Sequence, residues 1–237
     1  MRILVFQHEV VEHPGIFRRF LQEDGIPWDP VELDAGESIP PLDGYDALWA
    51  MGGPMDVWEE DRYPWLIDEK RAIREAIVER RMPFLGVCLG HQLLGDALGG
   101  KVGKMPLPEV GILEVQLTEA GKRDTLFAGI ASPSRCLQWH GSAVMEPPPG
   151  AEVLAGSPAC ACQAMRWGKR AYGIQYHVEI TGQTIPEWAA IPAYATALDQ
   201  TLGLGAATRF EGEASACLPE FNQAARTLYR NFLSLAA

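Results

Sequence analysis

A cysteine between two glycines is the feature of this sequence that most restricts its fold. Cys88 lies between Gly86 and Gly90, after the apolar run 83–87 and before an apolar helical stretch that we expect to end near Leu98. The pattern predicts a nucleophile elbow, a sharp turn from a strand into a helix where larger side chains would collide with neighbouring backbone. The positive end of the helix dipole then favours the thiolate. A lone cysteine is more often a buried structural residue, so the interpretation needs partners elsewhere in the chain.

Two further segments supply such partners. His177 and Glu179 are two residues apart, so on an extended segment both side chains project from one face, where the carboxylate can orient the imidazole. Upstream, the apolar run 47–51 leads into Gly52-Gly53-Pro54 and would expose a backbone N–H at the carboxyl edge of a sheet. Such donors stabilise the oxyanion of acyl transfer. Each motif alone is common, and together they predict a cysteine-dependent acyl-transfer site.

The order of the predicted elements indicates an α/β fold. Strands and helices alternate through the first hundred residues, which predicts a mostly parallel central sheet flanked by helices, with ligand sites beyond the carboxyl ends of the strands. The predicted strands are 2–7, 28–33, 47–51 and 83–87, and the predicted helices are 15–24, 67–81 and 89–98.

The second half of the chain changes character. Short apolar runs separated by turns rich in Pro and Gly, at 112–117, 153–156, 163–167 and 171–175, predict an antiparallel extension of the sheet. Helical patterns follow over 186–202 and 220–235. We therefore predict a catalytic domain over residues 1–184 and a C-terminal helical extension over residues 185–237 that packs on the same domain.

Composition excludes several classes of partner. The formal net charge of −11 argues against a surface for nucleic acid or anionic membrane, and no apolar run approaches the length of a membrane span.

The cysteines and the N-terminus bear on the compartment. The five cysteines form an odd set, and Met1 leads straight into a strand without a signal-peptide pattern, so we expect a cytoplasmic protein. Cys160-Ala161-Cys162 has no matching second ligand pair. We expect neither a metal nor a cofactor.

These motifs together resemble the class I (triad) glutamine amidotransferase family. Its fingerprint is an oxyanion Gly-Gly-Pro strand, a Gly-x-Cys-x-Gly-x-Gln elbow and a late His-x-Glu, and all three occur here in that order. The resemblance extends to Pro108-Glu109-Val110-Gly111, similar to a Glu-x-Gly loop of GMP-synthetase-like members, and to Trp139-His140-Gly141-Ser142 at the family's His-Gly loop. It spans residues 1–179 and implies a flavodoxin-like fold of this family's type.

The resemblance implies a role for eight residues. Cys88 would be the nucleophile, His177 the general base and acid, and Glu179 the residue that orients it. The remaining implied roles are oxyanion-hole N–H groups from Gly53 and Leu89, a contact from Gln92 to bound glutamine, and backbone contacts from Gly141 and Ser142 to its α-amino and α-carboxylate groups.

Two positions depart from the family pattern. Val178 replaces a common Pro. Ser142 follows His-Gly where close relatives often carry Asp, which removes a charge partner for the α-ammonium group.

The implied activity is hydrolysis of the glutamine γ-amide through a cysteinyl thioester, releasing ammonia for a separate acceptor. The chain has no Gly-x-x-x-x-Gly-Lys-[Ser/Thr] loop, so a synthetase or ligase subunit would be a partner. The first alternative is a γ-glutamyl peptidase or hydrolase that acts on γ-glutamyl amides. The second is a non-catalytic or regulatory protein on the same fold.

Overall fold

Five parallel strands form the part of the sheet that carries the cysteine elbow. The computed structural model describes residues 1–236, and in it these strands lie in the order β2-β1-β3-β4-β9. Strands β1, β3, β4 and β9 are buried along their whole length, as expected for parallel strands covered on both faces. The strands are β1 (Ile3–Gln7), β2 (Trp28–Glu32), β3 (Ala47–Ala50), β4 (Phe84–Val87) and β9 (Ala171–Ile174).

An antiparallel extension continues the sheet beyond β9, in the order β9-β8-β7-β5-β6. The α/β fold class with this extension is thereby confirmed. Its strands are β5 (Lys101–Leu117), β6 (Ser134–Glu146), β7 (Ala151–Gly156) and β8 (Ala164–Trp167), with the short 3₁₀ helix η2 (Gly121–Arg123) between β5 and β6. The sequence pattern did not predict β6 or the first half of β5, because bulges and exposed residues interrupt the alternation of apolar and polar positions.

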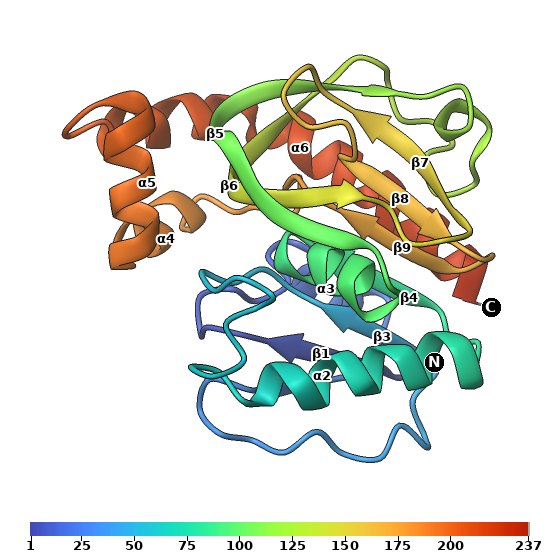
Figure 1. Cartoon of the computed structure of the whole chain (residues 1–237). Coiled ribbons are helices and arrows are strands. Elements are labelled where there is room, and N and C mark those ends of the chain that lie inside the picture. Colours follow the sequence, from blue (N-terminus) through green and yellow to red (C-terminus); the bar gives the residue numbers. More distant parts are fainter. Residues whose placement is uncertain (237) are drawn as a thin grey trace.

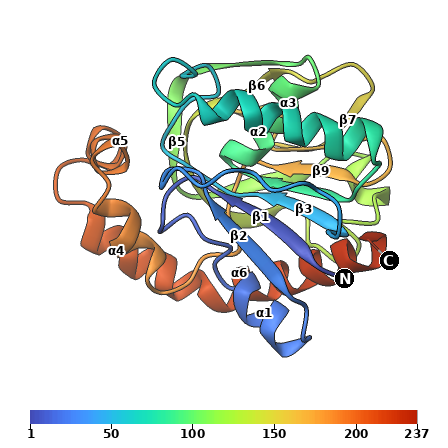
Figure 2. The same ribbon diagram turned by 90° about the horizontal axis from the view of Figure 1, so that it is seen from below.

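Helices cover both faces of the parallel strands (Figure 2). One face carries α1 (Phe17–Glu23) and α6 (Ala207–Ala236), and Trp49 of β3 packs there between Phe17 and Phe232 at ring distances of 5.5 and 5.8 Å. The other face carries α3 (Leu89–Ala97) and α2 (Trp65–Arg74), which continues as a π-helix, η1 (Glu75–Glu79). Each face therefore has its own hydrophobic cluster, with the elbow strand between them.

The C-terminal helices differ from the expected pattern in two places. Residues 186–202 were predicted as one helix, but Ile191 is extended and separates α4 (Thr184–Ala189) from α5 (Pro192–Leu202), as the residue before a proline tends to be. In contrast, α6 begins at Ala207 and runs through Pro219, where a new helix start was expected. Burial of one face of α6 holds it continuous there. Within residues 1–236 no helix is both long and apolar enough to cross a bilayer.

Candidate active site

Cys88 occupies the turn from β4 into α3 in a backbone conformation that is rare for a residue with a side chain. Its φ is 53° and its ψ is −103°, and its N–H donates to the carbonyl oxygen of Ile174 at 2.8 Å. The flanking glycines are required, because a Cβ at Gly86 would lie 2.3 Å from the oxygen of Gly90, and one at Gly90 would lie 2.0 Å from the oxygen of Ala50. This is the predicted elbow, and the strain is typical of functional turns.

His177 and Glu179 meet as their spacing predicted. Nδ1 of His177 lies 2.6 Å from Oε1 of Glu179, and Oε2 of the same carboxylate accepts the N–H of Val178 at 3.0 Å. Reciprocal backbone hydrogen bonds with Leu137 hold His177 just beyond β9. Burial disfavours the imidazolium, but the Glu179 carboxylate and the neighbouring Cys88 side chain outweigh burial and raise the pKa of His177 well above its usual value.

Gly53 and Leu89 are the two residues whose backbone N–H groups were predicted to receive the oxyanion. Leu89 is the first residue of α3, where the amide has no partner within the helix. Across residues 1–236 no group accepts a hydrogen bond from the N–H of Gly53. The two residues are close neighbours, since a Cβ on Gly53 would lie 2.8 Å from Cδ2 of Leu89. The structure therefore brings together the two segments predicted to donate to an oxyanion.

Gln92 links the elbow to the segment that carries Gly141 and Ser142. Its Nε2 donates to the carbonyl oxygen of Ser142 at 3.0 Å and to Oε1 of Gln175 at 3.1 Å, and Nε2 of Gln175 lies 3.6 Å from Sγ of Cys88. Gly141 and Ser142 belong to β6 rather than to a loop. The pairing of β5 with β6 passes from Lys104 opposite Ser142 to a new register, so Gly141 has no partner residue in the ladder.

The chain matches the family described as glutamine amidotransferase class-I over residues 18–188. It belongs to that family. It is 37% identical over 195 residues to the glutamine amidotransferase-like protein YfeJ of Salmonella typhimurium, covering 78% of each chain. It is 40% identical over 175 residues to the glutamine-hydrolysing GMP synthase of Aeropyrum pernix, covering 71% of this chain but only 31% of that one.

A solved family structure extends the likeness to the C-terminus. The crystal structure of a glutamine amidotransferase from Thermotoga maritima superposes with a TM-score of 0.87 at 27% identity and covers 98% of this chain and 97% of its own. The class-I family match itself ends at residue 188. Helices α5 and α6 therefore lie outside the family match but inside the structural one.

Aromatic side chains from the C-terminal helices cover the family site. Trp188 of α4 packs edge-on against the ring of His177 at 4.7 Å, and Trp139 of β6 contacts both Trp188 and Tyr194 of α5 at 5.8 Å. Figure 1 shows α4 and α5 beyond the edge of the sheet at which the parallel strands end. Cys88 itself is 6% exposed. Trp139, the first residue of the His-Gly motif, is thus part of this aromatic cluster.

Glu12 is a site neighbour that sequence reasoning missed. It follows β1, is 3% exposed, and accepts a hydrogen bond from the hydroxyl of Tyr194. A Cβ on Gly52 would lie 2.3 Å from its Oε2, so the carboxyl group touches the Gly-Gly turn. Burial raises the pKa of Glu12 to about 7, against the opposing effects of His177 and Tyr194. The only sequence signal was an acidic residue close after a parallel strand.

Asp56 places a carboxylate beside Ser142, the residue at which the sequence departs from the family pattern. The hydroxyl of Ser142 donates to Oδ1 of Asp56 at 2.6 Å, and Lys104 pairs with Oδ2 at 2.6 Å. That Ser142 removes a charge partner for the α-ammonium group stays a prediction, although Ser142 itself has an acidic neighbour. Asp56 belongs to the turn after Gly52-Gly53-Pro54, so its contact with Ser142 joins residues that are 86 apart in sequence.

The other four cysteines are buried and belong to segments other than the elbow turn. Burial raises the pKa of Cys160 to about 11 and of Cys162 to about 12, and raises that of Cys136 as well. Cys160 and Cys162 belong to different hydrophobic clusters and form no disulfide.

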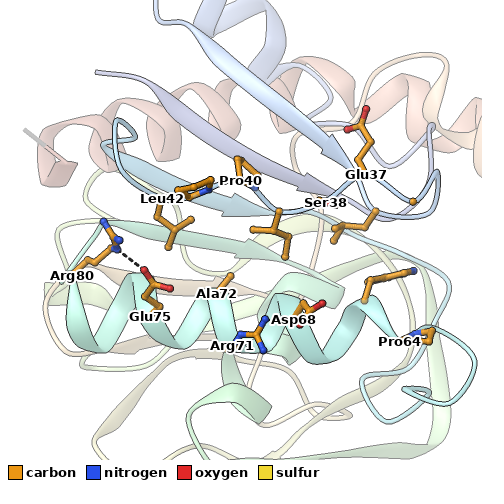
Figure 3. Close-up of a pocket in the computed structure, with 15 residues that line it drawn as sticks. Glu37, Ser38, Pro40, Leu42, Pro64, Asp68, Arg71, Ala72, Glu75 and Arg80 are labelled. Carbon is orange, nitrogen blue, oxygen red and sulfur yellow. Dashed lines mark hydrogen bonds and ion pairs between the residues drawn. The ribbon is translucent and has the colours of Figure 1, made fainter.

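A groove of about 650 Å³ lies away from Cys88, between α2 and the segment that joins β2 to β3. Figure 3 shows Pro40 and Leu42 on one side and Asp68, Ala72 and Glu75 on the other. None of the eight predicted site residues lines it. Trp65 connects the groove to the surroundings of the elbow, because it lines the groove and its ring stacks on that of His8.

Proposed function

We propose that this chain is a glutaminase of the glutamine amidotransferase type, which hydrolyses the γ-amide of glutamine through a cysteinyl thioester. The thiolate of Cys88 attacks the γ-carbonyl carbon, and the N–H groups of Gly53 and Leu89 receive the developing oxyanion. The imidazolium of His177 gives its proton to the departing nitrogen, so ammonia leaves and the thioester remains. Water then attacks the thioester with His177 as base, which releases glutamate and restores the thiol.

The observation that carries this proposal is the strained Cys88 beside a buried His177–Glu179 pair. A structural cysteine needs neither a positive φ nor glycines pressed against backbone oxygens. Glu179 holds the Nδ1 side of the imidazole, which leaves Nε2 for proton transfer with the thiol and the substrate. The raised pKa of His177 favours the imidazolium, the form that gives a proton to the departing nitrogen.

We assign recognition of the α-amino and α-carboxylate groups of glutamine to Gln92 and to β6, the strand that Gln92 contacts. Both hydrogen bonds of Gln92 use Nε2, so its amide oxygen is left as an acceptor for the α-ammonium group. The unpaired backbone of Gly141 offers a further contact to the α-groups. The carbonyl oxygen of Ser142 already accepts from Gln92 and lies 2.9 Å from Nδ1 of His140, so the part of Ser142 that reaches substrate is its N–H.

We further propose that a separate synthetase or ligase subunit takes up the ammonia. The support is that the GMP synthase relative is about three times longer than the segment matched here, and the rest of that chain has no counterpart in these residues. Hydrolysis of γ-glutamyl amides would use the same thioester, so the two functions differ only in the leaving amine and in the need for a partner.

The test is turnover of glutamine with mass analysis of the intact protein. We expect glutamate and ammonia in equal amounts, and a γ-glutamyl adduct on Cys88 after acid quenching. Purified protein that hydrolyses γ-glutamyl peptides much faster than glutamine would favour the γ-glutamyl hydrolase. Protein that forms neither product nor adduct with either substrate would favour the non-catalytic alternative.

A further inference from the structure

His8 lies directly beneath the Gly-Gly turn. It follows β1, is fully buried, and its Nδ1 lies 2.7 Å from the carbonyl oxygen of Gly52. Its Nε2 lies 2.8 Å from Oε1 of Glu69, which is on α2 and is also fully buried. A single chain of contacts thus runs from the middle of α2 through the imidazole to the turn that precedes Gly53.

The carbonyl of Gly52 and the N–H of Gly53 belong to the same peptide group. A hydrogen bond to the carbonyl oxygen fixes the plane of that peptide and therefore the direction of its N–H. It also polarises the peptide, which makes the N–H a stronger donor, because hydrogen bonds in a chain strengthen one another. A donor on Gly52 consequently acts on whatever accepts from Gly53.

Both ring nitrogens of His8 face acceptors, a carbonyl oxygen and a carboxylate oxygen. The imidazolium satisfies both with N–H donors, which a neutral ring cannot do. Burial disfavours that charge, but Glu69, the Gly52 carbonyl and Glu12 outweigh burial and raise the pKa of His8. Trp65 stacks on the ring at 5.5 Å with an interplanar angle of 18°, a favourable contact for a cation.

We propose that His8 and Glu69 are positioning residues for the oxyanion hole: the Glu69-held imidazolium fixes and polarises the Gly52–Gly53 peptide so that the Gly53 N–H meets the developing oxyanion. This inference rests on the proposed function. The pair is poorly explained as a device for stability, because buried ion pairs contribute little net stability and Oε2 of Glu69 has no hydrogen-bond partner among the described residues.

Two variants separate the charge of this relay from its hydrogen bond. Glu69→Gln keeps both contacts, since a neutral His8 can donate to Gly52 from Nδ1 and accept from the new amide at Nε2. It removes only the charge, and we expect kcat for glutamine to fall about tenfold, because charge-assisted hydrogen bonds are roughly twice as strong as neutral ones. The double variant Glu69→Gln/His8→Leu removes the donor without stranding a carboxylate, and we expect a fall of about 10²–10³-fold. KM should stay within about threefold in both, since the loss falls on the transition state.

A pair of probes separates an oxyanion effect from a structural one. The γ-aldehyde analogue of glutamine adds the Cys88 thiol across its carbonyl, so the thiohemiacetal oxygen occupies the oxyanion hole. Iodoacetamide alkylates the same sulfur with loss of iodide and forms no oxyanion. We expect the aldehyde inhibition constant to rise in parallel with the loss of kcat, while the alkylation rate of Cys88 stays at the wild-type value.

Asp96→Asn is the matched control, because Asp96 forms an ion pair at 2.7 Å with Lys70, the residue after Glu69 on α2. Variants that change kcat and aldehyde binding no more than this control overturn the inference. So does a parallel loss of alkylation, aldehyde binding and folded protein, which would mark a purely structural pair. Wild-type protein that neither hydrolyses glutamine nor binds the aldehyde overturns the proposed function and this inference with it, whereas active wild-type protein with unaffected variants overturns this inference alone.

Discussion

The hydroxyl of Tyr194 donates a hydrogen bond to the buried carboxyl group of Glu12, which lies 182 residues earlier in the chain. The contact joins the turn after β1 to α5, the helix that lies outside the class-I family match. His177 is among the groups that shift the pKa of Glu12, and its ring packs against Trp188, which also contacts Tyr194. The C-terminal helices thus contribute to the electrostatics of the site as well as covering it.

Stability should depend on pH through Glu12. Its folded pKa, about 7, is above the usual carboxyl value, so between about pH 4.5 and 7 the folded state holds a proton that the unfolded state has lost. The free energy of unfolding should therefore fall as the pH rises from about 4.5 to about 7. The full cost of the ionised carboxylate is present above pH 7, and none of it well below pH 4.5. We expect Glu12→Gln to stabilise the protein by up to about 3 kcal/mol at pH 8 and much less at pH 5, measured by urea unfolding.

The control for that measurement is Asp61→Asn, which changes an exposed carboxylate. It should shift stability by less than about 0.5 kcal/mol at either pH. A Glu12→Gln effect of equal size at pH 5 and pH 8 would contradict the assignment of a raised pKa to this group.

Replacing His177 should cost more activity than replacing its acceptor. His177→Ala deletes proton transfer and should lower kcat about 10²–10⁴-fold. Glu179→Gln leaves the base in place and retains an oxygen to accept from Nδ1, so its loss should be smaller. Matched steady-state kinetics on glutamine check this order, and equal losses would mean that the two roles are misassigned.

Cys88 should be the only cysteine needed for turnover. Cys88→Ala and Cys88→Ser should abolish hydrolysis while thermal unfolding remains cooperative, because each removes or exchanges only one atom of a small side chain at the margin of its hydrophobic cluster. Cys217→Ala on α6 is the control and should keep activity. Peptide mapping after iodoacetamide should find label at Cys88, and comparable label at the deeply buried Cys136 would contradict the assignment.

The parts of the site that sequence could predict are those encoded over a few residues. The elbow at Cys88 needs adjacent glycines, and the His177–Glu179 contact needs only a spacing of two on an extended segment. Glu12 and the buried pair under Gly52 were not predicted, because each meets its partner across 44 to 182 residues and carries no local pattern. The continuity of α6 through Pro219 likewise depends on packing against the sheet, which outweighs a local helix breaker.

Ser142→Asp should weaken the protein rather than improve its site. The Ser142 hydroxyl lies 2.6 Å from Oδ1 of Asp56, so the substitution sets two carboxylates in contact with one cation, Lys104, between them. We expect a loss of about 1–3 kcal/mol at pH 8, measured by urea unfolding. The KM for glutamine should rise with it, because Gln92 contacts the backbone of the same residue.

Exchanging the two side chains tests whether the pair acts as a unit. Asp56→Ser combined with Ser142→Asp restores one hydroxyl, one carboxylate and the charge partner of Lys104, so most of the lost stability and affinity should return. Residues in contact are expected to show such an interaction energy, whereas independent sites would add. The measurement is a double-mutant cycle by urea unfolding and by KM for glutamine at pH 8. A double variant no better than the sum of its singles would mean that Asp56 and Ser142 contribute separately, and that the carboxylate beside β6 has no part in holding the substrate strand.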